Sequence, residues 1–299
     1  MVLSLQSLLK TIKFPVVCYF YIARKGVIGL QEGNLDIDLE FLRREMLLIA
    51  TEFDKFCAEN DLRYFICCGS LLGGVRHGGF IPWDDDFDVA MPRSDYQKFL
   101  AKWEDSDNIK RISLGMAGYY KVGTPSKLYN PEYVIEEKYE FENGMPKYNP
   151  YGIFIDIFPL DNYPDTLIGH FVNAYVGKIL QAKSFSQFKM NKRKVTSRII
   201  FTFLRFIPAY VFKFIYKISQ NLISKKSAKR FWGYGIETTF SNLVADEDIL
   251  FPLAQIKFSG LNLKAPNNPD AYLKMRFGNY MKLPEEKDRQ THIASIKKR

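Results

Sequence analysis

Four aspartates lie within five positions of the chain, and this density of carboxylates is the part of the sequence with the clearest chemistry. They are Asp84, Asp85, Asp86 and Asp88. If residues 84–88 are extended, side chains alternate, so the first, third and fourth aspartates share one face and Asp85 points away. Carboxylates on one face repel unless a cation lies between them, and such hard oxygen ligands suit Mg²⁺ or Mn²⁺. The alternative is an acidic loop in solvent. The apolar neighbours of Asp88 favour a strand and a metal site instead.

A glycine-rich turn precedes these aspartates. Gly69 and Ser70 follow the β-like run 64–68 and precede a helical segment, so the turn offers backbone N–H groups and a hydroxyl to an anion. The glycine pairs at 73–74 and 78–79 permit close approach of the backbone. Each glycine signal by itself more often marks an ordinary turn. Together with the downstream Asp-x-Asp, they indicate a phosphate site beside a metal.

A third candidate carboxylate lies later in the chain. Asp156 is the only charged residue in the apolar, β-forming segment 152–160. Because burying an unpaired carboxylate is costly, we expect Asp156 to contact a cation, a metal or a network of donors. The structural alternative is an aspartate at a strand end, bonded to backbone N–H groups.

The hydrophobic pattern around these residues predicts a mixed α/β core. Apolar residues at three-and-four spacing predict an amphipathic helix over 37–60. The other predicted elements are strands at 64–68, 87–90, 109–114, 119–129 and 152–159, and helices at 71–76, from Pro92 to about 103, and at 269–277. The mixture indicates an α/β catalytic half with helical additions on its C-terminal side.

Composition indicates a globular protein of 299 residues, with 47% hydrophobic and 25% charged residues. Four cysteines are too few for a disulfide scaffold, and with three histidines no zinc-site spacing occurs. These counts favour a reduced, cytosolic compartment.

The net charge of +9 comes from two regions. Residues 166–236 hold fourteen Lys and Arg and no acidic residue, and residues 1–30 hold four basic residues and no acidic one. A regional excess of this kind calls for a regional explanation, such as a basic surface for a partner.

The basic region contains the aromatic and aliphatic run 199–216, which is interrupted too often by charge and proline to predict a membrane span. On one continuous helix, its basic residues fall within a wedge of about 120°, as in a helix lying in a membrane interface. These residues are Arg198, Arg205, Lys213 and Lys217. Pro208 is expected to kink or split the helix. The alternatives are core helices with a solvated basic face and, least favoured, a nucleic-acid surface, because the aromatic residues form one apolar face.

An apolar stretch at 14–23 superficially resembles a signal peptide, but no small-residue cleavage site follows it. We interpret it as a second interfacial element or as part of the core.

Three segments carry a family resemblance. The run 69–100 (GSLLGGVRHGGFIPWDDDFDVAMPRSDYQKFL) closely resembles the signature of the LicD family, whose best-known members are phosphocholine transferases related to fukutin-type proteins. The segments 152–161 and 271–284 are also similar, so the resemblance covers about 37–292. It implies a nucleotidyltransferase-type mixed sheet with helical C-terminal additions. Together with the charge pattern, it divides the chain into an interfacial or helical segment (1–36), a catalytic core (37–165), a basic, aromatic-rich helical region at a membrane surface (166–236) and a segment that completes the domain (237–299).

The resemblance also implies roles for individual residues. Asp86 and Asp88 would bind Mg²⁺ (or Mn²⁺), with Asp156 as third ligand or base. The candidate substrate-binding residues are Gly69, Ser70, Arg76, His77, Asp84 and Lys127. Fifteen residues separate Ser70 from Asp86, a long spacing for a generic nucleotidyltransferase that LicD-like sequences share. His292 also resembles a position in LicD-like sequences, but no other feature of the sequence indicates a role for it.

The implied reaction moves phosphocholine from CDP-choline to a hydroxyl of a cell-surface glycan or its lipid-linked precursor, such as lipopolysaccharide, teichoic acid or capsule. An enzyme bound to the anionic inner face of the cytoplasmic membrane would meet such an acceptor there. Transfer of another phospho-group, a phospho-sugar or phospho-alditol, is the enzymatic alternative. A non-catalytic membrane-associated scaffold is disfavoured by the intact aspartates, and no nucleic-acid partner is expected.

Overall fold

The computed structural model describes residues 38–116, 119, 123–138, 151–186, 195–239, 243–289 and 291–299. The apolar stretch at 14–23, predicted to be interfacial or part of the core, lies outside these residues.

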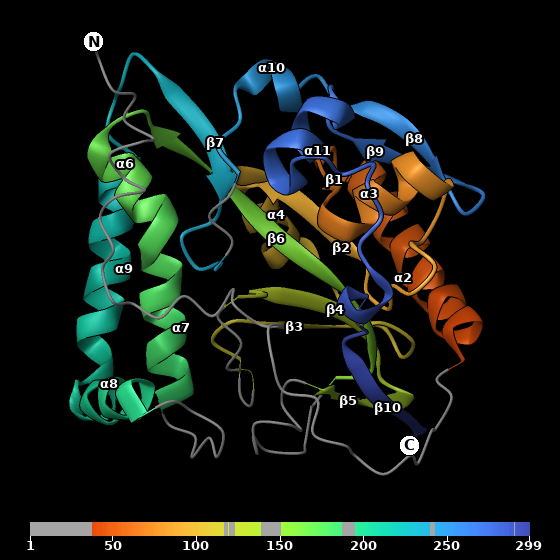
Figure 1. Ribbon diagram of the computed structural model, residues 1–299, viewed down its shortest axis with the longest axis horizontal. Helices are drawn as coiled ribbons and strands as arrows, with labels where there is room; N and C mark the ends of the chain where they lie inside the picture. The colour runs from red at the N-terminus through yellow and green to blue at the C-terminus, as the bar shows by residue number, and fades with distance from the viewer. Residues whose placement is uncertain are drawn as a thin grey trace.

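A six-stranded mixed sheet forms the centre of the described chain (Figure 1). Its main path runs β1 (Phe65–Ile66), β2 (Asp88–Pro92), β6 (Ile153–Pro164), β4 (Ser126–Asn130) and β3 (Lys110–Ser113). Strand β7 (Arg230–Tyr234) pairs with the second half of β6. Strands β2 and β6 are parallel and the other pairs are antiparallel. This mixture of helices and a mixed sheet confirms the predicted α/β class.

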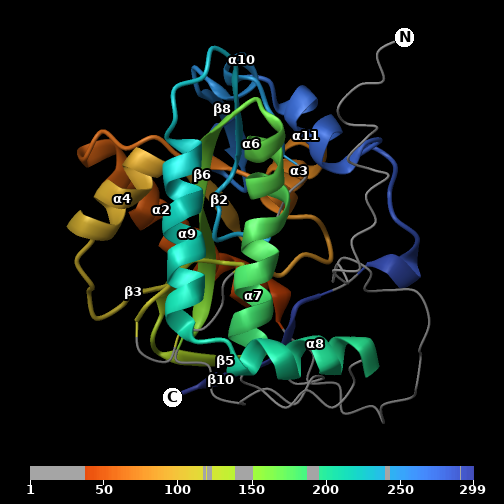
Figure 2. The ribbon, with the colours of Figure 1, turned by 90° about the vertical axis from the view of Figure 1, so that its left-hand side faces the viewer.

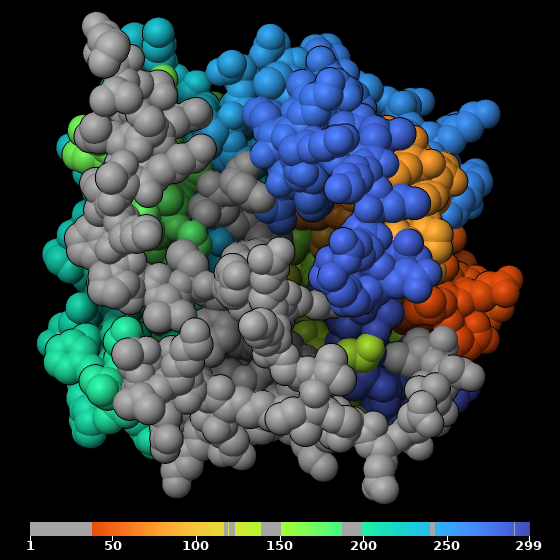
Figure 3. Space-filling view, viewed as in Figure 1, coloured from red at the N-terminus to blue at the C-terminus, as the bar shows by residue number. Residues whose placement is uncertain are grey.

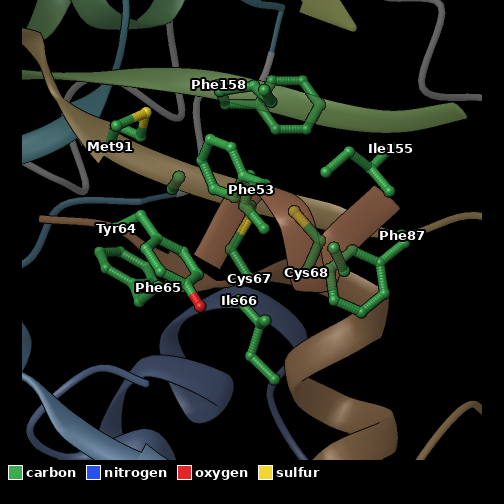
Figure 4. Close-up of a cluster of buried hydrophobic side chains, with 14 of the residues drawn as sticks. Phe53, Tyr64, Phe65, Ile66, Cys67, Cys68, Phe87, Met91, Ile155 and Phe158 are labelled. Atoms are coloured by element: carbon green, nitrogen blue, oxygen red, sulfur yellow. The ribbon is translucent and has the colours of Figure 1, made fainter. Parts of the chain in front are cut away.

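Helix α2 (Leu39–Glu59) covers part of this sheet and confirms the helix predicted over 37–60. It begins after Asp38, whose carboxylate accepts a hydrogen bond from the N–H of Phe41, as an N-cap does. Its apolar face packs against β4 and β6. Figure 4 shows the resulting core, in which Phe53 of α2 meets side chains of β1, β2 and β6.

Two helices directly follow strands of the central sheet. Helix α3 (Cys68–His77) begins directly after β1, three residues earlier than the sequence predicts. Helix α4 (Arg93–Lys102) begins after Pro92, as predicted, and packs on β2 and β6. Strand β6 extends to Pro164, five residues beyond the predicted end, because its second half gains β7 as a partner. Of the strand predicted over 119–129, the structure shows β4.

The C-terminal part of the chain returns to this core. The hairpin of β8 (Ala254–Phe258) and β9 (Leu261–Ala265), the short α10 (Glu247–Leu250) and helix α11 (Pro269–Phe277) lie on the side of α3 and β1. Strand β10 (Ile293–Lys298), which no pattern predicted, pairs with β5 (Tyr133–Glu137). Figure 3 shows the C-terminal residues in blue lying against the orange α3 region.

A separate helical layer stands on one side of the sheet (Figure 2). It consists of α6 (Leu167–Phe171), η1 (Val172–Val176), α7 (Gly177–Ser186), α8 (Val195–Phe206) and α9 (Ala209–Ile223). Pro208 caps α9, and α8 and α9 meet at 92°, which confirms the predicted split. The single helical wheel used for 199–216 is therefore wrong, because the two helices point in different directions.

Among the described residues, no single helix is long and apolar enough to cross a membrane. The bent pair Ile199–Phe206 and Ala209–Ile223 meets the length and composition criteria only when the two helices are taken together.

Candidate active site

A row of charged residues crosses the middle of the sheet. Asp88 lies opposite Asp156 in the parallel pairing of β2 with β6, and Asp156 lies opposite Lys127 in the antiparallel pairing of β6 with β4. Residues directly opposite one another share a face of the sheet. The three residues are nearly buried, with exposed fractions of 7%, 6% and 2%. The structure thus brings together three of the residues predicted from sequence.

Asp156 has a cationic partner within the protein. The Lys127 ammonium donates a hydrogen bond to Asp156 Oδ1 at 2.5 Å and lies 3.3 Å from the centre of the Phe154 ring. Burial raises the pKa of Asp156 to about 6, although the lysine acts in the opposite direction. The cation expected at Asp156 is therefore Lys127, and a role for Asp156 as third metal ligand remains a prediction.

Asp84 lies against the first turn of α3. A Cβ placed on Gly69 would approach Asp84 Oδ2 to 2.9 Å, so any larger residue would force this carboxylate to move. The same oxygen is buried without a hydrogen-bond partner. Burial first, and then the charges of Asp86 and Asp85, raise the pKa of Asp84 to about 9. Burial and the neighbouring acids therefore disfavour the charged form of this carboxyl, although Arg43 acts in the opposite direction.

The carboxylates of this region influence one another electrostatically. Burial and then the charge of Asp86 raise the pKa of Asp88 well above its usual range, with smaller effects from Asp156 and Asp84. Asp86 is the more open member, since 23% of its side chain is exposed. Asp88 thus lies beside Asp156, and convergence of Asp86 with these two acids around a metal ion remains a prediction.

This charge distribution fits a divalent cation held by two carboxylates. Mg²⁺ is commonly bound by one or two carboxylates, with water and substrate phosphates completing its shell. Within the described part of the chain, no group of three or more His, Cys, Asp or Glu side chains is arranged to hold a metal ion. Metal binding by Asp86 and Asp88, with substrate phosphate completing the shell, therefore remains a prediction.

Asp85 points away from the other acids, as the alternation predicts. Its carboxylate is fully buried and accepts hydrogen bonds from the N–H groups of His292 and Ile293, the shortest at 2.7 Å. These bonds hold the start of β10 beside the site. As a result, His292 Nε2 lies 3.6 Å from Asp86 Oδ2. His292 thus reaches the site from the far end of the chain.

Arg43 of α2 holds the loop that carries Asp84. Its guanidinium donates to the carbonyl oxygens of Ile81, Pro82 and Asp84 at 2.8–3.1 Å. No sequence signal distinguishes this arginine, because polar residues on an amphipathic helix usually face solvent. Only the packing of α2 beside the loop identifies its role.

The predicted phosphate-binding turn coincides with the N-terminus of α3. Ser70 Oγ accepts a hydrogen bond from the Asp88 N–H at 2.8 Å, so this hydroxyl joins α3 to β2. Helix α3 has no side-chain cap, and its first-turn N–H groups, including those of Gly69 and Ser70, have no acceptor within the helix. Phosphate binding by Gly69 and Ser70 remains a prediction, with the backbone N–H groups as its donors.

Arg76 and His77 end α3 near the acids. Arg76 Nη1 donates to the carbonyl oxygen of Tyr280 at 3.0 Å, and its Nε donates to His77 Nε2 at 2.9 Å. Burial lowers the pKa of Arg76, and attraction to Asp84 acts against this effect. Arg76 thus connects α3 to the C-terminal segment, and substrate contact by either residue remains a prediction.

A buried polar chain missed by the sequence reasoning supports the start of α3. The Cys68 thiol lies 3.1 Å from the Tyr234 hydroxyl, which lies 2.6 Å from the Tyr272 hydroxyl. Arg276 Nη2 approaches the same sulfur at 3.8 Å. The segment 271–284, noted only for its family likeness, therefore packs directly on α3.

The order of these elements agrees with the nucleotidyltransferase-type domain that the resemblance implies. Strand β1 leads into the first turn of α3 at Gly69-Ser70, and the acids lie on strands β2 and β6. The comparison with known families agrees, since the LicD/FKTN/FKRP nucleotidyltransferase domain matches residues 61–201. Residues 61–201 therefore match the LicD nucleotidyltransferase domain, in agreement with the resemblance noted in the sequence. The match continues past the predicted boundary at 165, and the division into four segments remains a prediction.

Individual relatives extend this comparison. The lipopolysaccharide cholinephosphotransferase LicD of Haemophilus influenzae is 25% identical over 272 residues, which cover 84% of this chain and 95% of that protein. Uncharacterized proteins of Rickettsia prowazekii and Rickettsia typhi are 43% and 41% identical over 53 residues, or 17% of this chain and 20% and 17% of theirs.

Proposed function

We propose that this protein is a transferase that moves phosphocholine onto a hydroxyl of lipopolysaccharide or a related cell-surface glycan. The main support is the similarity to a lipopolysaccharide cholinephosphotransferase along nearly the whole of that relative. The row formed by Asp88, Asp156 and Lys127 beside the α3 N-terminus supports it with suitable chemistry. CDP-choline is the proposed donor.

The residues of the chain have distinct proposed tasks. The first-turn N–H groups of α3 bind phosphate oxygens of the donor, because a helix N-terminus favours anions. Asp156 is proposed to accept the proton of the acceptor hydroxyl, since a carboxylate with a pKa near neutrality suits general base catalysis. Lys127 holds Asp156 in position. His292, whose Nε2 lies 3.6 Å from Asp86 Oδ2, is proposed to bind the donor phosphate.

Asp86 and Asp88 are the proposed ligands of Mg²⁺ or Mn²⁺. When bound, the ion would neutralise the diphosphate and stabilise its developing charge. The excess of buried carboxylates over nearby cations supports this proposal.

A test incubates the purified protein with CDP-choline, lipopolysaccharide and Mg²⁺, and measures both CMP release and phosphocholine on the glycan. We expect Asp86→Asn to abolish both signals. Asp248→Asn, which removes an exposed carboxylate of α10, is the matched control and should leave both unchanged. Absence of transfer by the folded wild-type protein with every choline-containing donor would contradict the proposal.

Parallel reactions distinguish the remaining possibilities. CDP-linked alditols and nucleotide-linked phospho-sugars test transfer of another phospho-group, and capsule or teichoic acid fragments test other acceptors. Failure to cleave any donor would leave only the non-catalytic scaffold.

The location at the cytoplasmic face of the membrane also belongs to this proposal, since a lipid-linked acceptor is reached there.

A further inference from the structure

The helices α8 and α9 present apolar side chains to solvent. On α8 these are Ile199, Phe203 and Phe206, and on α9 they are Tyr210, Phe214 and Ile218. Their exposed fractions range from 40% at Ile218 to 79% at Phe206. Single exposed apolar residues are common, but a contiguous set indicates an interaction surface. We call these six residues the apolar rows.

Within the described part of the chain, the apolar rows are not part of a hydrophobic core. The opposite side of α9 packs into a small buried cluster with β6, β7 and η1, which includes Tyr163, Val172 and Phe231. Helix α9 is therefore anchored through its inner side. The outer side is available to a partner without any change in the core.

The right angle between α8 and α9 is held by an internal cation. Lys183 of α7 donates to the carbonyl oxygens of Leu204 and Ile207 at 2.9 and 2.5 Å, at the C-terminal end of α8. A cation at this end of a helix satisfies carbonyls that have no partner within the helix. Figure 2 shows α8 crossing below α7 and α9 on the same side of the molecule. Both helices are thus presented on one side in a defined arrangement.

Basic residues accompany the apolar rows. At 100° per residue, Lys213 and Lys217 fall directly beside Tyr210, Phe214 and Ile218 on α9, and both lysines are exposed. Residues 166–236 contain no Asp or Glu, so neither α8 nor α9 offers a negative charge of its own. The surface is apolar and positively charged together.

The positive charge beside the apolar rows favours one kind of binding partner over the others. A second copy of the chain docked through the same rows would set basic residues against basic residues. Residues 1–30 would also bring only basic charge, since they contain no acidic residue. An anionic phospholipid surface supplies both an apolar interior and negative headgroups.

We propose that the apolar rows of α8 and α9, with Lys213 and Lys217 beside them, dock the protein on an anionic phospholipid surface. The proposal concerns binding alone and does not depend on the reaction proposed above. It places the contact on two crossed helices, whereas the sequence pattern indicated one continuous helix.

The test is sedimentation of the full-length protein with vesicles of phosphatidylcholine alone or with phosphatidylglycerol. We expect retention on the anionic vesicles at low salt and release at high salt. Lys213→Glu/Lys217→Glu should weaken retention about tenfold or more, since each basic residue near such a surface contributes on the order of a tenfold factor or less. Phe203→Gln/Phe214→Gln should also release the protein.

Matched controls carry the same changes elsewhere. Lys110→Glu/Lys257→Glu makes the same change in net charge at exposed strand positions, and Leu48→Gln replaces an exposed apolar residue of α2. These variants should bind like the wild type. Thermal unfolding verifies that every variant is folded. If either the double lysine variant or the double phenylalanine variant does not fold, the other variant and the salt dependence of wild-type binding still test the proposal.

Several results would overturn the proposal. These are no retention of wild-type protein on anionic vesicles, equal loss in variants and controls, and self-association that the phenylalanine substitutions abolish without vesicle binding. CMP release from soluble CDP-choline is measured on the same samples. Normal release without vesicle binding would contradict this proposal alone, and vesicle binding without release would contradict the proposed reaction alone.

Discussion

Lys127 Nζ lies 2.5 Å from Asp156 Oδ1 across strands β4 and β6, and both side chains are almost completely buried. The sheet register places the two residues directly opposite each other. A buried carboxylate at the centre of the site is therefore maintained by a lysine from the neighbouring strand. This relationship makes the stability of the sheet and the chemistry of the site depend on the same two residues.

Removing one partner of this ion pair should destabilise the fold. We expect Lys127→Ala to lower the free energy of unfolding by about 3–5 kcal/mol, because it leaves a buried charge uncompensated. Chemical denaturation measures this change. The double variant Lys127→Met/Asp156→Leu should lose much less stability, although it should lack activity. Equal losses in the single and double variants would show that the two residues are not coupled.

The space in front of Gly69 should matter for activity. A methyl group from Gly69→Ala would displace the Asp84 carboxylate, which lies 2.9 Å from its Cβ position. We expect donor turnover to fall by about 10²-fold, in the range seen when one positioned polar group of a site is lost. Gly78→Ala is the comparison. Gly78 has φ of 70° and nothing near its Cβ position, so that variant should cost about 1 kcal/mol of stability and retain activity.

Asp85 should control the attachment of the C-terminal strand. Asp85→Ala removes the acceptor of the His292 and Ile293 N–H groups, and bonds to a charged acceptor contribute about 1.5–3 kcal/mol each. Hydrogen exchange at Ile293 should therefore become faster. Exchange in α2 serves as the internal reference. Unchanged protection of Ile293 would contradict the anchoring role.

Metal binding should depend on Asp86 and Asp88. We expect Mg²⁺ or Mn²⁺, together with a non-hydrolysable CDP-choline analogue, to raise the melting temperature of the wild-type protein, because a ligand that binds the folded state stabilises it. Asp86→Asn and Asp88→Asn should remove the metal-dependent part of this rise. Asp85→Asn is the neighbouring control and should retain it. Titration calorimetry checks the result without turnover, and an equal rise in all variants would place the ion elsewhere.

Local elements of the fold followed well from the sequence. Apolar spacing located α2, Pro92 preceded α4, and Pro208 separated α8 from α9. Alternation within 84–88 placed Asp85 on the opposite side from its neighbours, as the structure shows. These predictions succeeded because periodic burial and backbone restrictions act between residues that are close in sequence.

The partners of the site residues did not follow from the sequence. Lys127 and Asp156 are 29 residues apart, and Asp85 and Ile293 are 208 apart. The role of Lys127 was predicted as substrate binding, and the structure shows its ammonium bound to Asp156. Arg43 looked like any polar residue of an amphipathic helix.

The amino-acid sequence by itself determined that carboxylates gather beside a glycine turn and that one region is uniformly basic. The tertiary structure decided which strand lies next to which, and therefore that Asp156 pairs with a lysine while Asp86 stays more open. The physical reason is that strand register and helix packing depend on the mutual burial of distant segments. No pattern within one segment contains that information.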